Sequence, residues 1–286
     1  MRSRISLGRR LGSLLLLLAA ALLWLRPALT EPDTGTGTGV IIPIDGPIGP
    51  ATSDFFVRSL EKAAASGADF AVVTIDTPGG LDSAMRDIVQ AILAARMPVI
   101  GFVYPSGARA ASAGTYILYA THVAAMAPAT NLGAATPVQI GAPSTGKKNP
   151  FSDPRDETEE PEGPAENDES AANERPPAAE QPGGAMERKA VNDAVAYIRG
   201  LGELRGRNTD WAELAVREGA SLPANEALEL GVIDLIAEDV PALLKAIDGR
   251  IVKLKTGEVE LATAGTTLNE MQPDWRTDLL LSLIHI

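Results

Sequence analysis

The chain of 286 residues has no cysteine, only two histidines and 4% aromatic residues. The absence of cysteine excludes a disulfide scaffold, a thiolate metal site and a cysteine nucleophile. With His122 and His285 as the only imidazoles, the sequence does not favour a zinc site, and a serine nucleophile would need His122 or a base other than histidine. Basic residues are also in deficit, and the net charge of -12 argues against a nucleic-acid partner.

The negative charge is concentrated in one stretch. Residues 150–185 contain eleven acidic residues and two arginines among many prolines and alanines. Such a composition cannot bury enough apolar surface to fold, so we expect an acidic disordered insertion over residues 140–185. The rest of the chain is close to neutral, and we expect one folded domain at residues 38–248 with a C-terminal extension at 249–280.

Both ends of the chain differ from its body. Four arginines in the first ten residues precede an apolar run at 11–25, an order typical of an export signal. This run is short for a membrane-spanning helix and no clean cleavage site follows it. We therefore expect residues 1–30 to be either a signal peptide or a membrane anchor, with the folded domain outside the cytoplasm. Residues 281–286 match the translation of a sequencing adapter, so the chain is expected to be a fragment whose extension leads toward a missing membrane region.

From Gly39 onward, short apolar runs alternate with amphipathic stretches. The apolar runs predict strands at 40–44, 70–75, 98–104, 122–127 and 232–236. Helical spacing predicts helices at 52–65, 82–95, 113–120 and 186–204, followed by two shorter helices of which the second is at 223–230. The alternation predicts an α/β layered fold.

The first motif with chemical interest is Asp76-Thr77-Pro78-Gly79-Gly80, directly after a predicted strand and before a predicted helix. Two glycines allow a tight turn that presents backbone N–H groups to a ligand, and the helix N-terminus adds partial positive charge. An oxyanion hole or an anion site requires this geometry. Taken alone, the motif favours a plain structural turn.

The second motif covers residues 107–115 and again joins a strand to a helix. Ser112 is flanked there by alanine and glycine, so no bulky neighbour hinders a substrate, and the N–H of Ala113 is placed to bind a developing oxyanion. Small residues also suit close helix packing, so this motif too is ambiguous by itself.

The two motifs together, followed by Ala127-Pro128 and Gly133, resemble the ClpP-like serine protease superfamily. Within it the chain is most similar to the membrane-bound NfeD group, the stomatin operon partner proteases. The resemblance covers residues 40–239, including 206–208 (Gly-Arg-Asn) and a segment at 226–234 that signal peptide peptidase A also carries. It implies a ClpP/crotonase-like fold of repeated ββα units.

The resemblance also implies a serine endopeptidase with a Ser-Lys dyad, in which Ser112 is the nucleophile and Gly79, Gly80 and Ala113 form the oxyanion hole. Of seven lysines, Lys189 fits the family pattern as the general base, because an asparagine, an Ala-Tyr-Ile stretch and the Gly-Arg-Asn sequence follow it. No metal and no organic cofactor are implied. The implied substrates are hydrophobic segments of membrane proteins, such as the C-terminal part of a stomatin-like partner, and the implied assembly is a homodimer or a higher homo-oligomer.

Lys189 poses a physical difficulty. A lysine that takes a proton from serine near neutral pH must have its pKa lowered from about 10.4 to about 7, which requires burial. Helical periodicity places Lys189 opposite the apolar stripe of its helix and therefore predicts exposure. The assignment holds if the start of the helix faces a cleft, or if a neighbouring subunit or the acidic insertion covers the lysine. Lys147 and Lys148 are weaker candidates, since nothing in their Gly/Pro/Ser-rich surroundings would desolvate them.

Other residues and other functions stay open from the sequence. His122 fits a histidine at the start of a core strand better than a partner of Ser112, Arg109 either orients substrate or pairs with an acid, and Asp76 supports the glycine turn. The alternatives to a stomatin-directed protease are a non-proteolytic assembly partner of stomatin-like proteins and an activity like that of signal peptide peptidase. A crotonase-type acyl-CoA enzyme is disfavoured by the export signal.

Overall fold

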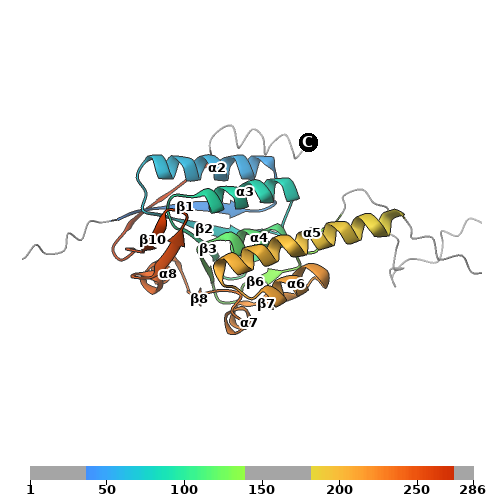
Figure 1. Cartoon of the computed structure of the whole chain (residues 1–286). Helices are drawn as coiled ribbons and strands as arrows, with labels where there is room; N and C mark the ends of the chain where they lie inside the picture. Colours follow the sequence, from blue (N-terminus) through green and yellow to red (C-terminus); the bar gives the residue numbers. More distant parts are fainter. Residues whose placement is uncertain (1–36, 139–181, 274–286) are drawn as a thin grey trace, which may run out of the picture. The chain divides into compact units, whose positions relative to one another are not determined.

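The computed structural model describes residues 37–138 and 182–273 (Figure 1). The expected export signal, most of the expected acidic insertion with Lys147 and Lys148, and the adapter-like end lie outside these residues. Within the described ranges, no helix has both the length and the apolar character needed to cross a membrane.

A six-stranded parallel sheet organises the chain, with the strand order β11-β1-β2-β3-β5-β8. Its strands are β1 (Thr38–Asp45), β2 (Phe70–Asp76), β3 (Val99–Val103), β5 (Val123–Met126), β8 (Leu235–Ile236) and β11 (Thr267–Glu270). The central strands β3 and β5 are buried along their whole length. A parallel sheet covered on both faces requires such continuous apolar strands.

The helices cover the two faces of the sheet unequally. One face packs on α2 (Pro50–Ala65), α3 (Asp82–Ala94), α4 (Ala113–Ala120), α5 (Pro182–Arg205), α6 (Thr209–Arg217) and α7 (Ala224–Glu229). The other face packs on α8 (Val240–Ile247) and on the hairpin of β9 (Ile251–Leu254) and β10 (Gly257–Glu260). Each face of the sheet has its own hydrophobic cluster, and alternate residues of one strand pack into the two clusters. In β2, Val73 packs on the side of α2 to α7 and Val72 on the side of α8 and the hairpin.

A second, small sheet lies beside the main one and carries the order β4-β6-β7. Its strands are β4 (Arg109–Ala111), β6 (Asn131–Gly133) and β7 (Ser221–Pro223). A main-sheet strand, a small-sheet strand and a helix follow one another twice in the chain, as β3-β4-α4 and as β5-β6-α5. The α/β fold and its ββα units, expected from the sequence, are therefore confirmed.

Most predicted elements are present with shifts of a few residues at their ends, and α4 has the bounds that the sequence predicts. The strand predicted at 232–236 is shorter, because the N–H groups of Val232 and Ile233 bond to the carbonyl of Ala227 and close α7. Helix α5 begins at Pro182, inside the range assigned to the acidic insertion. In the range assigned to a C-terminal extension, β11 pairs with β1 at the edge of the main sheet.

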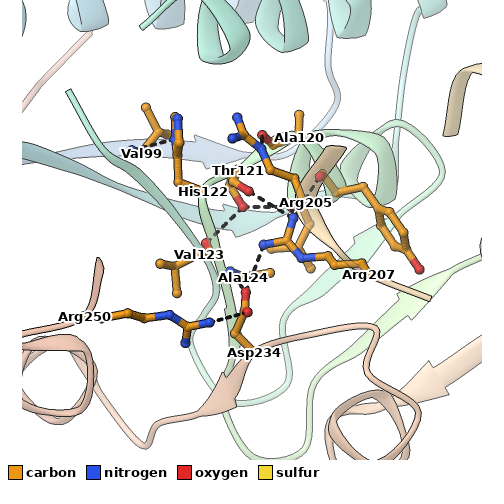
Figure 2. A network of polar contacts seen from close by, with 12 residues as sticks. Val99, Ala120, Thr121, His122, Val123, Ala124, Arg205, Arg207, Asp234 and Arg250 are labelled. Atoms are coloured by element: carbon orange, nitrogen blue, oxygen red, sulfur yellow. Dashed lines mark hydrogen bonds and ion pairs between the residues drawn. The ribbon is translucent and has the colours of Figure 1, made fainter. Parts of the chain in front are cut away.

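A buried ion pair joins the end of α5 to the strand β5 (Figure 2). Arg207 is 6% exposed. Its Nη1 donates to the carbonyls of Tyr119 at 2.8 Å and Thr121 at 2.9 Å. Its Nη2 donates to the Asp234 carboxylate at 2.9 Å. Asp234 also accepts from the Ala124 N–H at 2.7 Å and from Arg250 at 2.6 Å. Burial raises the pKa of Asp234, but Arg207 and the Ala124 N–H outweigh it and hold this pKa below its usual value. The carboxylate therefore stays charged in the folded protein.

His122 lies next to this network, at the start of β5 (Figure 2). Its Nδ1 accepts a hydrogen bond from the Val99 N–H at 3.1 Å, so this nitrogen carries no proton. Burial lowers the pKa of His122 to about 3, and the neighbouring Arg205 acts in the same direction. His122 is thus a neutral structural residue at the opposite end of α4 from Ser112, as the sequence favours.

Replacing Asp234 with asparagine should destabilise the fold by about 3–5 kcal/mol, because the buried Arg207 guanidinium loses its counter-charge. The matched control is Asp210→Asn, which removes an exposed carboxylate that pairs with Arg199 at 3.4 Å and should cost less than about 1 kcal/mol. Urea unfolding of the two variants at pH 7 measures the difference. Equal losses would show that the Arg207 charge does not depend on Asp234.

Acidification should destabilise the protein through His122. In the unfolded chain this histidine takes a proton near pH 6.5, whereas in the folded protein it does so only near pH 3. Stability is therefore complete above about pH 6.5 and is expected to fall by about 2 kcal/mol between pH 7 and pH 5. His122→Asn removes the titrating group, so its urea midpoint should change less over this range; parallel curves for the two proteins would contradict the assignment.

Candidate active site

The two glycine-rich motifs are hydrogen-bonded to each other. The Thr77 N–H donates to the Arg109 carbonyl at 2.7 Å, and the Ala111 N–H donates to the Thr77 carbonyl at 3.1 Å. One Asp76 carboxylate oxygen accepts from the Arg109 N–H at 3.1 Å. The first motif, which follows β2, therefore runs alongside β4 of the second motif. Asp76 fixes this junction, as the sequence suggests, and the Arg109 side chain is exposed.

Ser112 occupies a strained backbone position between β4 and α4. Its φ of 52° and ψ of −116° are rarely adopted by residues other than glycine. Its N–H donates to the Gly133 carbonyl at 2.8 Å, which holds this conformation. A serine on a sharp strand-to-helix turn is the arrangement in which hydrolases present a nucleophile. Strain of this kind persists only where the surrounding structure enforces it.

Gly79 and Gly80 form a turn against the serine side chain. A Cβ on Gly79 would lie 2.6 Å from the Ser112 Cβ and 3.1 Å from its Oγ, so any larger residue would press on the hydroxyl. Gly79 also has a φ of 111°. A Cβ on Gly80 would lie 2.0 Å from the carbonyl oxygen of Ile48. The Gly79 N–H donates to the Thr77 hydroxyl at 3.0 Å, so Gly79 shapes the turn and offers no free donor.

Two backbone N–H groups near Ser112 remain available. In the described part of the chain, neither the N–H of Gly80 nor that of Ala113 has a hydrogen-bond acceptor. Ala113 is the first residue of α4, where N–H groups have no partner within the helix. Donors that are already oriented and unpaired can bind negative charge as it develops on a substrate carbonyl.

Thr115 supports the site and was not singled out from the sequence. Its hydroxyl is fully buried, lies 2.8 Å from the Ala110 carbonyl and 3.0 Å from the Gly133 carbonyl, and accepts from the Gly133 N–H at 3.1 Å. It thereby ties β4 and β6 to the first turn of α4. A threonine among small residues three positions after the serine is a weak signal, since only the fold reveals its partners.

Lys189 lies on the part of α5 that extends past the serine end of α4. The Tyr197 ring of α5 stacks on Tyr116 in α4 at 6.1 Å, and Arg207, just after α5, binds the last turn of α4. The two helices therefore run in the same direction, and Lys189 precedes Tyr197 by about two turns. Its side chain is exposed, as helical periodicity predicts. Within the described residues, the Lys189 side chain is not buried as a neutral amine requires, and no hydrogen bond joins it to Ser112.

The described residues contain no group of three or more histidine, aspartate and glutamate side chains arranged to hold a metal ion. The groups that converge at the ends of β2 and β4 are a hydroxyl, two N–H donors and glycine backbone. This set can bind a carbonyl group and attack it, provided that a base removes the serine proton.

Comparison with known proteins gives the sequence relatives of the chain. Residues 38–152 match the family model of the NfeD1b N-terminal domain. Membrane-bound protease PH1510 of Pyrococcus horikoshii is 33% identical over 269 residues, which make up 89% of this chain and 53% of that protein. Membrane protein NfeD1b of Bacillus subtilis is 37% identical over 99 residues, or 34% of this chain and 22% of that protein. The chain thus spans about half the length of the first relative and less of the second.

Solved structures extend the likeness to the fold. The 1510-N membrane-bound stomatin-specific protease, as a lysine-to-alanine mutant in complex with a substrate peptide, matches with a TM-score of 0.68 and 31% identity, covering 88% of this chain and 100% of that one. A serine-to-alanine mutant of the same protease matches with a TM-score of 0.66 and 32% identity, covering 84% and 99%. The chain therefore belongs to the NfeD family, and its described residues have the ClpP-like α/β fold of the 1510-N structures.

Proposed function

We propose that this protein is a membrane-associated serine endopeptidase that cleaves hydrophobic segments of membrane proteins such as stomatin-like partners. The observation that carries the proposal is the position of Ser112, strained at the start of α4 with its hydroxyl against Gly79 and unpaired N–H groups nearby. The names of its relatives, a membrane-bound protease and a stomatin-specific protease, support the reaction and the substrate class.

In this mechanism the Ser112 Oγ attacks the carbonyl carbon of the scissile peptide while its proton passes to the neutral Nζ of Lys189. The N–H groups of Gly80 and Ala113 donate to the oxygen that becomes negative. The lysine then gives the proton to the leaving amine, the C–N bond breaks and an acyl-enzyme remains. Water, deprotonated by Lys189, hydrolyses the ester and regenerates Ser112.

Lys189 is the general base of this proposal because α5 carries it to the serine end of α4. The substrate-peptide complex of 1510-N is that of a lysine-to-alanine mutant, which is consistent with a lysine base in that protease. Since Lys189 is exposed in the single chain, we infer that a second copy of the chain or the acidic insertion covers it in the active assembly. The catalytic domain then lies outside the cytoplasm, with residues 1–30 as its signal or anchor.

The exposure of Lys189 also favours a second candidate, a non-proteolytic assembly partner that binds stomatin-like proteins at the same surface. The two functions differ in what Ser112 does. A binding partner would retain its ligand and release no product. A protease would still bind its substrate after removal of the Ser112 hydroxyl and would lose only turnover.

Ser112→Ala should reduce peptide cleavage by at least about 10⁴-fold, and Lys189→Ala by about 10²–10⁴-fold, because they remove the nucleophile and the base. The full chain in detergent is incubated with hydrophobic peptides, including C-terminal segments of stomatin-like proteins, and products are identified by mass spectrometry. Peptide binding is measured in parallel by fluorescence anisotropy.

The control for these two variants is Lys245→Ala, which replaces a lysine at the end of α8 on the other face of the sheet. It should leave cleavage unchanged. Cleavage that persists in Ser112→Ala would refute the nucleophile. Peptide binding with no cleavage by the unaltered protein would support the assembly partner instead.

Gly79→Ala should lower kcat by more than about tenfold, since its Cβ would displace the Ser112 side chain. Gly67→Ala is the matched control: Gly67 also has a positive φ, of 77°, but a Cβ there would meet nothing within 4 Å. Both variants should lose about 1 kcal/mol of stability from backbone strain. An equal loss of activity in the two would show that the Gly79 effect comes from destabilisation alone.

A further inference from the structure

Arg86 of α3 lies between two carboxylates from different helices. Its Nε donates to Asp82 at 2.8 Å, within α3, and its Nη2 donates to Asp193 of α5 at 2.7 Å. The Arg86 side chain is 31% exposed, whereas those of Asp82 and Asp193 are 69% and 68% exposed. The arginine is thus the better-buried centre of a three-residue ionic cluster.

An aromatic pair extends this cluster to α4. The Arg86 guanidinium lies 4.4 Å from the centre of the Tyr197 ring, and that ring stacks on Tyr116. The Tyr116 hydroxyl donates to the Ala135 carbonyl at 3.1 Å. A cation over an aromatic face is attracted by the ring and adds to the ionic contacts. Arg86 therefore connects α3, α4 and α5 in one contiguous set of contacts.

These three helices carry all the groups of the proposed reaction near their N-terminal ends. Helix α3 begins two residues after Gly80, α4 begins directly after Ser112, and α5 carries Lys189 in its second turn. Arg86 contacts α3 and α5 directly, and α4 through the stack of Tyr197 on Tyr116, within a few turns of these groups.

Asp193 has a second possible partner on its own helix. It follows Lys189 by four residues, and residues at this spacing lie on the same face of a helix within reach of each other. An aspartate paired with Lys189 would stabilise the charged ammonium and hold it away from Ser112. Arg86 now occupies that carboxylate.

We propose that Arg86 is a positioning residue of the proposed protease, which keeps Asp193 away from Lys189 and fixes the segment of α5 that carries this base. The inference rests on the proposed Ser-Lys function. It assigns Arg86 an effect on the charge state of Lys189 in addition to its effect on packing.

The other charged and titratable groups around this segment do not replace Arg86. On α5 they are Glu187, Arg188 and Tyr197; Glu187 lies two residues from Lys189 and so not on the same face of the helix. From α3 comes Asp82, from α4 Tyr116, and from α6 Arg217, which donates to Asn192 at 3.0 Å. Burial raises the pKa of both tyrosines, so they are neutral near pH 7. Partial burial lowers the pKa of Arg86, but Asp82 and Asp193 outweigh it and keep the guanidinium charged.

The test compares Arg86→Met, Asp193→Asn and the double variant in the full chain. Activity rises with pH as the base loses its proton, and Arg86→Met both frees Asp193 and removes a positive charge near Lys189. The midpoint of the kcat/KM profile should therefore move up by about 0.5 pH unit, which lowers kcat/KM about threefold below the midpoint. In Asp193→Asn the pH midpoint should not move up. In the double variant the midpoint should lie within about 0.2 pH unit of that of the unaltered protein.

Arg199→Met is the matched control, because Arg199 lies on α5, is 35% exposed and, like Arg86, binds two carboxylates, Asp210 and Glu213. Its pH midpoint should not move, although it should lose stability comparable to that of Arg86→Met. Equal upward movement in the two, or no rescue by the double variant, would overturn the proposal.

A direct titration separates this inference from the proposed function. The chain has seven lysines, so the Lys189 signal can be assigned in an NMR titration of ¹³C-labelled lysine by comparison with Lys189→Arg. The titration midpoint of Lys189 should increase in Arg86→Met and revert in the double variant even if the protein cleaves no peptide. An unchanged midpoint in a fully active protease would refute the role of Arg86 and leave the Ser-Lys mechanism intact.

Discussion

The backbone pairing of Thr77 with β4 is the contact on which the candidate site depends. It takes the chain segment that leaves β2 and fixes it beside the segment that leads into α4, although the two are more than thirty residues apart in sequence. Gly114 allows this approach, since a Cβ there would lie 2.6 Å from the Thr77 methyl group. Without this pairing, the glycine turn and the serine would belong to two independent loops, and the unpaired N–H of Gly80 would not be held near Ser112.

The strain at Ser112 follows from the same constraint. A strand that pairs with Thr77 on one side and with β6 on the other must end abruptly for a helix to begin at Ala113, and Ser112 absorbs the change of direction. The buried Thr115 hydroxyl and the Ser112 N–H both bond to the Gly133 carbonyl, so one oxygen of β6 holds the turn twice. A cost of about 1–3 kcal/mol for such a conformation is typical of functional sites. The large apolar core on that face of the sheet supplies the stability against which this strain is maintained.

The sequence is informative where one periodicity runs over many residues, and uninformative where structure comes from contacts between distant residues. The apolar runs at 70–75 and 98–104 could be placed because parallel strands are buried on both faces, and the helix at 82–95 because it buries one face. The three-residue strands β4, β6 and β7 could not, since three residues carry no periodicity. Strand β11 has exposed or half-buried residues and becomes a strand only through pairing with β1. Ser112 and the two glycines were found from their motifs, whereas Thr115 and Arg86 act through partners that only the fold brings near.

The exposure of Lys189 links the proposed chemistry to assembly. A lysine in water is protonated at neutral pH, and keeping one neutral there costs about 4–5 kcal/mol. The described residues contribute no burial toward this cost at Lys189, so it must come from whatever covers α5. If a second copy does so, part of the favourable free energy of association offsets the cost of deprotonating Lys189. The fraction of the enzyme that has a neutral base then depends on protein concentration. Arg86 lowers that cost by engaging the one carboxylate that sits a helical turn from the amine. In this view the single chain prearranges the serine, the oxyanion donors and the charge around the base, and assembly completes the site by removing water from the lysine.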